Sequence, residues 1–410
     1  MLNYFTITSL LENDMYKFNM GQVSFTQYAG TLVKWRYKCR NEGVTFTPEM
    51  HDEINAQIDH YCSLSFSDRE LRALAEKAPW LSESYLSYLR LWRPLRDQIH
   101  CELRQDHTLN LWAEGPWCQT IYYEVPLLAI VNEVYYRYHY SEAEYVGLEK
   151  SLYDRLALKI ADLGSGKFKL GPFSEFGMRR RFSAVTQAAV VKAFALAQKV
   201  GKLGASTFVG TSNVYLAVKL GTKAIGTIAH EAIEVIGQGD PSLNPAFSNR
   251  FMMKAWHKEF GLKNGIYLTD CIGTDVCLLD LDDTECRMWD GFRHDSGDPY
   301  AWGERMLAHL AAHHTDPSGK TLLFSDCLDF QRASDLYAYF KSRVKVAFGI
   351  GTFIANDTDA EPLNQVMKVI EVNGRPVAKL ADVAGKTMCE DAAYVDYLKR
   401  SIQWRLSHTK

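Results

Sequence analysis

The chain has 410 residues, of which 47% are hydrophobic and 23% are charged, and its formal net charge is -3. This is the composition of an ordinary globular protein of two or three domains, and the near-balanced charge gives no reason to expect nucleic acid or a membrane surface as a partner. The nine cysteines show no CxxC or Cys/His finger spacing, which argues against a zinc site or a disulfide framework. With no signal-like apolar stretch at the N-terminus, we expect a cytoplasmic protein.

The first part of the chain, residues 1–165, predicts a mixed α/β domain. Residues 31–40 and 108–117 alternate apolar and polar side chains, as strands do. Residues 67–79 and 84–92 have helical spacing, with Ser67 and Ser82 placed as N-caps. Pro126 falls early in an apolar helix over 124–140, where its missing N–H costs little.

From residue 166 to 360 the pattern changes to short apolar runs that alternate with helical segments. Seven such runs predict strands around residues 174–177, 207–209, 224–227, 265–268, 289–292, 322–324 and 344–348. Strands that alternate with helices form a parallel sheet, which is either open or closed. We favour an irregular seven-stranded α/β barrel of the TIM type. Residues 361–410 predict a hairpin, which turns at Asn373 and Gly374, and a helix, which together return to the N-terminal domain.

Polar and glycine residues follow the predicted barrel strands, as in barrels whose active site lies at the carboxyl ends of the strands. They include Thr211, His230, Asp270, Gly349 and Gly351. The "FGIGT" stretch after the last strand offers backbone N–H groups with little side-chain obstruction, which suits a phosphate.

Three consecutive arginines, Arg179, Arg180 and Arg181, follow the first of these strands. Such a run is more often a solvated helix start than a site, and at most two of the three can face one site. An arginine at a strand end suits a bidentate clamp on a carboxylate or phosphate. We expect Arg179 in that role, with Phe176 stacking on a planar substrate.

The "FRHDSGDP" stretch combines two roles. Asp298 before Pro299 predicts a helix cap. Because alternate residues of a strand share a face, Arg293 and Asp295 are expected to point into the site together. No HxH or HExxH set appears, so we expect no tightly bound transition metal, and Mg²⁺ held through substrate phosphates fits the sparse carboxylates.

Seven stretches together resemble nicotinate phosphoribosyltransferase, a type II phosphoribosyltransferase: "LLENDMYKFNM", "EFGMRRR", "GTSNVYLA", "GTIAHE", "FRHDSGDP", "FSDCLDF" and "FGIGT". The resemblance extends from about residue 8 to beyond residue 390. It implies transfer of phosphoribose from phosphoribosyl pyrophosphate (PRPP) to nicotinate, which gives nicotinate mononucleotide and pyrophosphate and opens the salvage route to NAD. It also implies coupling to ATP hydrolysis, so that the enzyme acts as a ligase, with Mg²⁺ as cofactor.

The resemblance also assigns roles to residues of this chain. Arg293, Asp295 and a transiently phosphorylated His230 form the implied catalytic set. Mg²⁺ and the ribose hydroxyls would lie by Asp270 and Asp295, and the 5′-phosphate by Gly349, Gly351 and Thr352. The nicotinate contacts would be Thr227 and Arg293, with the ring between Tyr16 and Phe176, and Arg179 would be an anion-binding arginine near the base and the phosphates. Asp14 and Tyr16 would come from the neighbouring subunit of a homodimer. Substrate contacts are also expected from Thr211, Ser212 and Ser325.

Three other functions stay open at this point. Nicotinamide phosphoribosyltransferase shares the implied fold, but it carries an acidic residue near "GTSN", where this chain has the neutral Ser212 and Asn213. A sugar-phosphate aldolase or isomerase would need a Schiff-base lysine or a carboxylate base at a strand end, and no such lysine is evident. A barrel that only binds a phosphometabolite would turn over no substrate.

Overall fold

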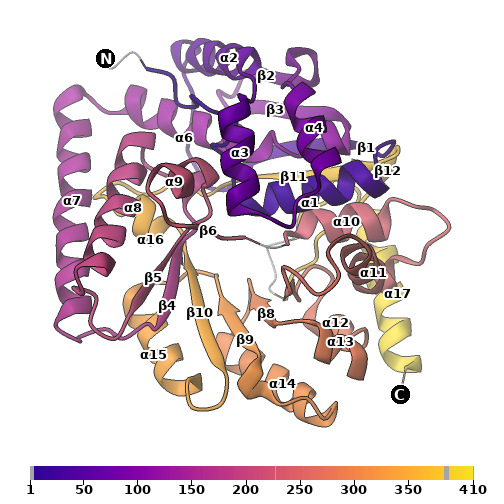
Figure 1. The fold of residues 1–410 in the computed structure, drawn as a ribbon. Helices are drawn as coiled ribbons and strands as arrows, with labels where there is room; N and C mark the ends of the chain where they lie inside the picture. Colours follow the sequence, from indigo (N-terminus) through magenta and orange to yellow (C-terminus); the bar gives the residue numbers. More distant parts are fainter. Residues whose placement is uncertain (1–3, 227, 383–386, 410) are drawn as a thin grey trace.

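The computed structural model describes residues 4–226, 228–382 and 387–409 and contains two sheets. One is parallel and curled, in the order β6-β5-β4-β10-β9-β8-β7, and the other is antiparallel, in the order β12-β11-β1-β3-β2 (Figure 1). The parallel strands are β4 (Pro172–Glu175), β5 (Thr207–Thr211), β6 (Lys223–Ala224), β7 (Ile266–Leu268), β8 (Gly291–His294), β9 (Thr321–Phe324) and β10 (Lys345–Ile350). The antiparallel strands are β1 (Leu32–Cys39), β2 (Ile99–Leu103), β3 (Leu109–Pro116), β11 (Gln365–Val372) and β12 (Arg375–Pro376).

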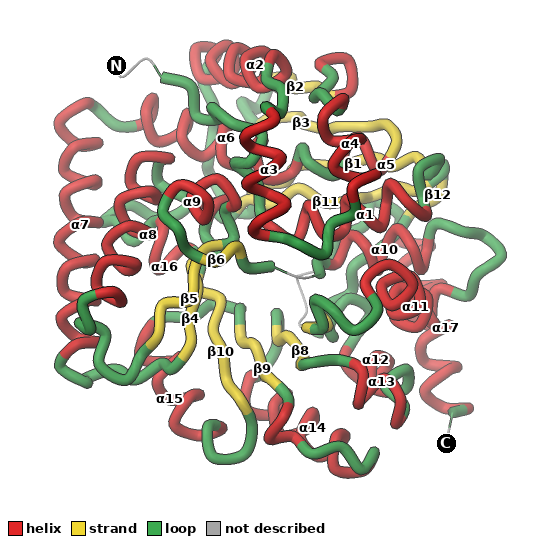
Figure 2. The backbone as a smooth tube through the Cα atoms, viewed as in Figure 1, coloured by secondary structure: helices red, strands yellow, loops and turns green. Residues whose placement is uncertain are grey.

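The seven predicted barrel strands all form, each displaced by at most a few residues. The predicted barrel is confirmed in an incomplete form, because no pairing joins β6 to β7 within the described residues. The chain between these two strands instead forms α10 (His230–Gln238) and α11 (Ser248–Phe260), which pack on each other. Figure 2 shows the strands fanning out from β6 to β8. The remaining helices of this part are α8 (Ala184–Lys199), α9 (Val214–Lys219), α12 (Thr274–Leu278), α13 (Asp283–Met288), α14 (Pro299–Ala312), α15 (Phe330–Phe340) and α16 (Thr352–Ala355).

Side-chain caps fix where several helices begin. The predicted cap Ser67 forms a full capping box with Glu70, and Ser82 accepts from the Tyr85 N–H. Asp298 caps α14 by accepting from the Ala301 N–H at 2.7 Å, as predicted. The helices before the barrel are α1 (Met15–Gln27), α2 (Pro48–Ser63), α3 (Asp68–Lys77), α4 (Glu83–Leu91), α5 (Trp117–Thr120), α6 (Glu124–His139) and α7 (Glu142–Gly164).

The C-terminal segment completes the N-terminal sheet. β11 pairs with β1 from Val33 opposite Val372 to Cys39 opposite Gln365. The turn to β12 places Asn373 and Gly374 at positive φ, which these two residues tolerate. The predicted return of the hairpin is therefore confirmed, while the domain boundaries 1–165, 166–360 and 361–410 stay predictions. The chain ends with α17 (Ala392–His408), which contacts α12 and the short 3₁₀ helix Pro245–Phe247.

Helix α1 joins the two parts of the molecule. The Met15 N–H donates to the Ser212 carbonyl at 2.8 Å, and the Asn19 side chain donates to the Gly226 carbonyl at 2.9 Å. The carboxyl ends of β5 and β6 therefore face the first turns of α1. Among the described residues, no helix combines the length and apolar character needed to cross a membrane.

Candidate active site

A histidine and two carboxylates meet at the ends of β6, β7 and β8. His230 begins α10, and its Nε2 lies 2.8 Å from Oδ1 of Asp270 and 3.7 Å from Oδ2 of Asp295. Asp270 also accepts from the Ser296 hydroxyl at 2.6 Å, and its Oδ2 lies 3.6 Å from the ammonium group of Lys379. The predicted strand ends thus bring His230, Asp270 and Asp295 together.

The charges of this cluster follow from its burial and its cations. Burial alone would raise the pKa of Asp270, but His230, Lys379 and the hydroxyl of Ser296 hold it well below its usual range. Burial, and then the charge of Lys379, lower the pKa of His230 to about 4. Near neutral pH the imidazole is therefore neutral and the carboxylate is ionised.

The hydrogen bond to Asp270 selects one tautomer of His230. An ionised carboxylate only accepts hydrogen bonds, so Nε2 carries the proton of the neutral ring. The lone pair is then on Nδ1, which has no hydrogen-bond partner among the described residues. The ring is held from one nitrogen and is nucleophilic at the other.

Arg293 of β8 and Asp295, the first residue after that strand, lie close together, as the alternation predicts. The Arg293 guanidinium lies 3.7 Å from Oδ1 of Asp295 and donates to the Ile228 carbonyl at 3.0 Å. Ser325 donates to the same Oδ1 at 2.9 Å. His294 lies between them in sequence and is buried on the other face against Trp302 and Phe324. Arg293 is thereby fixed near the residues that precede His230.

The three clustered groups are compatible with a magnesium ion only in part. Their potential ligand atoms lie within 4.8 Å of one another. Mg²⁺ prefers oxygen ligands, but both oxygens of Asp270 already face His230, Ser296 and Lys379. Asp295 is about a quarter exposed and suits a metal held mainly by substrate phosphates.

The predicted aromatic pair lies on α1 and on the loop after β4. Tyr16 is buried, and burial raises the pKa of its hydroxyl well above the usual value, against the opposing charge of Arg179. The ring of Phe176 covers Gly349, where any Cβ would overlap it. Gly349 is thus needed for the position of Phe176.

Asp14 and Tyr16 lie at the site of their own chain. The Ser212 hydroxyl donates to Asp14 at 2.6 Å, and Arg179 is the charge with the largest influence on both Asp14 and Tyr16. The expectation that a neighbouring subunit supplies these two residues is wrong in this structure, because α1 folds back onto the carboxyl end of β5. The homodimer itself stays a prediction.

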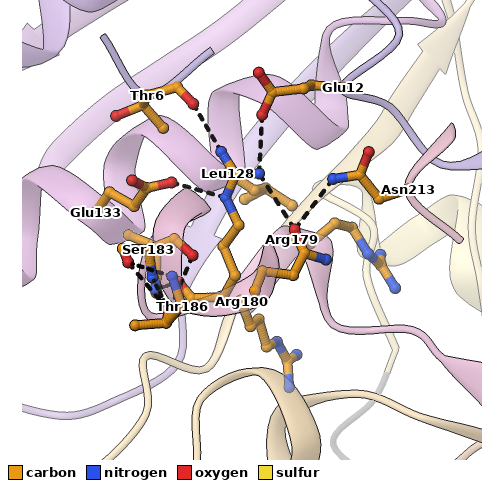
Figure 3. Close-up of polar contacts among 12 residues, drawn as sticks. Thr6, Glu12, Leu128, Glu133, Arg179, Arg180, Ser183, Thr186 and Asn213 are labelled. Carbon is orange, nitrogen blue, oxygen red and sulfur yellow. Dashed lines mark hydrogen bonds and ion pairs between the residues drawn. The ribbon is translucent and has the colours of Figure 1, made fainter. Parts of the chain in front are cut away.

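The arginine run divides into three different environments. Arg181 is buried and bonds to Glu133 at 2.7 Å, to Glu12 at 3.0 Å and to the Thr6 carbonyl at 2.7 Å. Figure 3 shows Arg179 and Arg180 pointing away from this group. Arg180 contacts Asn364 at 3.0 Å, while Arg179 pairs with Glu124 at 3.1 Å and remains about a third exposed. Arg179 can face a ligand, and Arg181 cannot.

The remaining predicted substrate contacts lie in different surroundings. The hydroxyl of Thr211 donates to the buried Glu175 at 2.5 Å, so it positions the end of β5. Gly351 and Thr352 open the short α16, whose first N–H groups have no partner within the helix. Thr227 lies outside the described residues.

Several charged residues near the site were not predicted from the sequence, because charged side chains are usually exposed. Lys17 is fully buried, pairs with Glu124 at 2.8 Å and contacts Glu231. Glu124 also faces the ammonium of Lys368 at 3.4 Å. A buried, charged network therefore extends from Arg179 to the residue next to His230.

Comparison with known proteins agrees with this geometry. The family model described as the nicotinate phosphoribosyltransferase (NAPRTase) family matches residues 172–405, and the model of its N-terminal domain matches residues 11–132. The chain belongs to the nicotinate phosphoribosyltransferase family. It is 40% identical over 398 residues to nicotinate phosphoribosyltransferase of Bordetella bronchiseptica, covering 97% of this chain and 95% of the relative. The Acidovorax sp. (strain JS42) protein of the same name is also 40% identical, over 96% of this chain and 98% of its own.

Solved structures of the family share the fold. Nicotinate phosphoribosyltransferase from Vibrio cholerae superposes with a TM-score of 0.88 at 34% identity, over 98% of this chain and 95% of that one. The Porphyromonas gingivalis enzyme gives 0.88 at 28% identity, over 97% and 100%. The incomplete barrel with its antiparallel partner sheet is thus the fold of nicotinate phosphoribosyltransferases.

Proposed function

We propose that the chain transfers phosphoribose from PRPP to nicotinate, producing nicotinate mononucleotide and pyrophosphate for NAD biosynthesis. The single observation that carries this proposal is the convergence of Arg179, Arg293 and the buried aromatic Tyr16 on the strand ends beside His230. Nicotinate and PRPP are both anions, so their encounter requires fixed cations. The pyridine nitrogen carries no proton, and its attack on the anomeric carbon therefore needs no general base.

Coupling to ATP is the second part of the proposal. His230 accepts the γ-phosphoryl group at Nδ1: the Nδ1–P bond forms as the bond from phosphorus to the β,γ-bridging oxygen breaks, and ADP leaves. Water later hydrolyses the phosphohistidine to phosphate. The neutral ring, oriented by Asp270, supports this role. The new phosphoryl group adds about -1.5 to -2 charges if it resembles other phosphorylated side chains, and Lys379 and Arg293 are the nearby cations.

Mg²⁺ would supply charge neutralisation for the departing pyrophosphate. Asp295 is the carboxylate that would hold it, together with substrate phosphates. Ser325 and Arg293 fix the orientation of that carboxylate. The 5′-phosphate is assigned to Gly349, Gly351 and Thr352.

Nicotinamide is the competing base, and one observation favours it. Asp14 places a carboxyl group against Ser212, where the nicotinamide enzyme has an acidic residue. Burial raises the pKa of Asp14, against the lowering effect of Arg179. We favour nicotinate because Arg179 and Arg293 both offer a cation to its carboxylate.

The test is a set of steady-state rates with nicotinate and nicotinamide, each with PRPP, Mg²⁺ and with or without ATP. Preference for nicotinamide would refute the assignment of the base. The His230→Asn variant is expected to form no phosphohistidine and to lose ATP stimulation while retaining some transfer at high PRPP. Full ATP stimulation of this variant would refute the phosphohistidine.

A further inference from the structure

One face of α10 carries three polar residues at intervals of four: His230, Glu234 and Gln238. Residues four apart lie on the same side of a helix, and all three side chains are buried. His230 begins this row in the candidate site. Gln238 ends it and clamps Ala378: its Nε2 donates to the Ala378 carbonyl at 2.9 Å, and the Ala378 N–H donates to its Oε1 at 2.8 Å.

This clamp fixes Lys379 relative to His230. Lys379 follows Ala378, and its ammonium group lies 3.6 Å from the carboxylate that holds the His230 ring. Tyr394 of α17 donates to Gln238 at 3.1 Å and supports the clamp from the other side. A single helix therefore sets both the imidazole and the nearest lysine.

Glu234 lies between these two fixed points and has an unusual environment. Its side chain is completely buried, and neither carboxyl oxygen has a hydrogen-bond partner among the described residues. Buried carboxyl groups almost always have one, so the charge of Glu234 depends on more distant groups. Burial raises the pKa of Glu234 to about 7, against the opposing charges of Lys368 and Lys379. The charged and titratable groups that face it are Lys368, Lys379, Glu231, Glu124, Cys271, Cys389 and Tyr394.

We propose that Glu234 is a positioning residue for the phosphoryl-transfer step, which acts through Lys379. While His230 is unmodified, the Glu234 carboxylate balances the charge of Lys379 and Lys368. When His230 is phosphorylated, Glu234 takes up one proton from solvent and becomes neutral. The positive charge of Lys379 then attracts the phosphoryl oxygens without being offset by Glu234. This inference rests on the proposed ATP coupling.

Charge repulsion sets the direction in which pH changes ATP binding. An added phosphoryl charge within a buried site raises the proton affinity of a nearby carboxyl group. Conversely, an ionised Glu234 weakens the binding of the anion. The ATP concentration for half-maximal phosphohistidine formation should therefore rise as the pH increases through neutrality, roughly three- to thirtyfold for charges several ångströms apart at a moderate dielectric.

The experiment measures phosphohistidine formation against ATP concentration, in Mg²⁺, from pH 6 to 8.5. Glu234→Gln keeps the shape of the side chain and removes its charge. At every pH, the half-maximal ATP concentration of this variant should therefore stay near the low-pH value of the wild-type enzyme. Glu234→Asp should restore the pH dependence. Glu371→Gln, on the strand that carries Lys368, serves as the matched control. Its half-maximal ATP concentration should change with pH as it does in the wild-type enzyme.

The outcomes separate the two proposals. If the wild-type enzyme forms no phosphohistidine, both the ATP coupling and the role of Glu234 are overturned. If it forms phosphohistidine and Glu234→Gln keeps the same pH dependence, only the role of Glu234 is overturned.

Discussion

Replacing Arg181 with methionine should destabilise the fold, whereas the same change at Arg179 should impair nicotinate binding. Arg181 is about 1% exposed and neutralises Glu133 and Glu12, which are equally buried. Removing one partner of a buried ion pair costs about 3–5 kcal/mol. Unfolding entropies near 2.1 cal/mol/K per residue give about 0.9 kcal/mol/K for 410 residues, so the thermal midpoint should fall by about 3–6 °C if the chain unfolds as one unit.

Arg179→Met is the comparison. Its partner Glu124 keeps Lys17 at 2.8 Å, so the loss of stability should be much smaller. A lost charge-assisted hydrogen bond to the nicotinate carboxylate is worth about 1.5–3 kcal/mol, which corresponds to an increase in KM for nicotinate of roughly 10- to 150-fold. Calorimetry and steady-state rates measure the two effects. An Arg181→Met protein with an unchanged midpoint and a raised KM would refute the division of roles.

Three further changes test separate parts of the site. Gly349→Ala should displace the Phe176 ring and lower kcat/KM for nicotinate by about two- to thirteenfold, since the stacking contact is worth roughly 0.5–1.5 kcal/mol. Gly30→Ala, at a position with open space, should leave kcat/KM unchanged. Lys17→Met leaves two buried carboxylates without their shared cation and should cost about 3–5 kcal/mol in a denaturant titration; a loss below about 1 kcal/mol would contradict the charged state of this network. Removing Mg²⁺ with excess EDTA should stop turnover without lowering the thermal midpoint, because the metal is expected to arrive with substrate phosphates; a large fall in the midpoint would indicate a structural metal.

The barrel was predictable because its strands are short apolar runs and its site residues follow them directly. Arg293 and Asp295 alternate along one strand, so their common face follows from period two alone. The caps of α3 and α14 are similarly local, since Ser67 and Asp298 lie within three residues of the N–H groups they accept from. Features of this kind need no knowledge of distant contacts.

The charged network behind the site was not predictable for the opposite reason. Lys17, Glu124 and Lys368 come from three distant segments, and charged side chains such as these are usually exposed. Only tertiary packing shows that they are buried together. The origin of Tyr16 is a related case, because a sequence does not distinguish a segment that folds onto its own chain from one that reaches a partner.

The position of β11 in the N-terminal sheet has a consequence for synthesis of the chain on the ribosome. β1 pairs with β3 on one side and with β11 on the other, and β11 ends at residue 372. Until nearly the whole polypeptide has emerged, one edge of β1 has no neighbour. An open strand edge invites pairing with other chains, and all seven strands of the parallel sheet are synthesised while the earlier sheet is still incomplete. Nascent chains halted before residue 365 should therefore aggregate more readily than the finished protein.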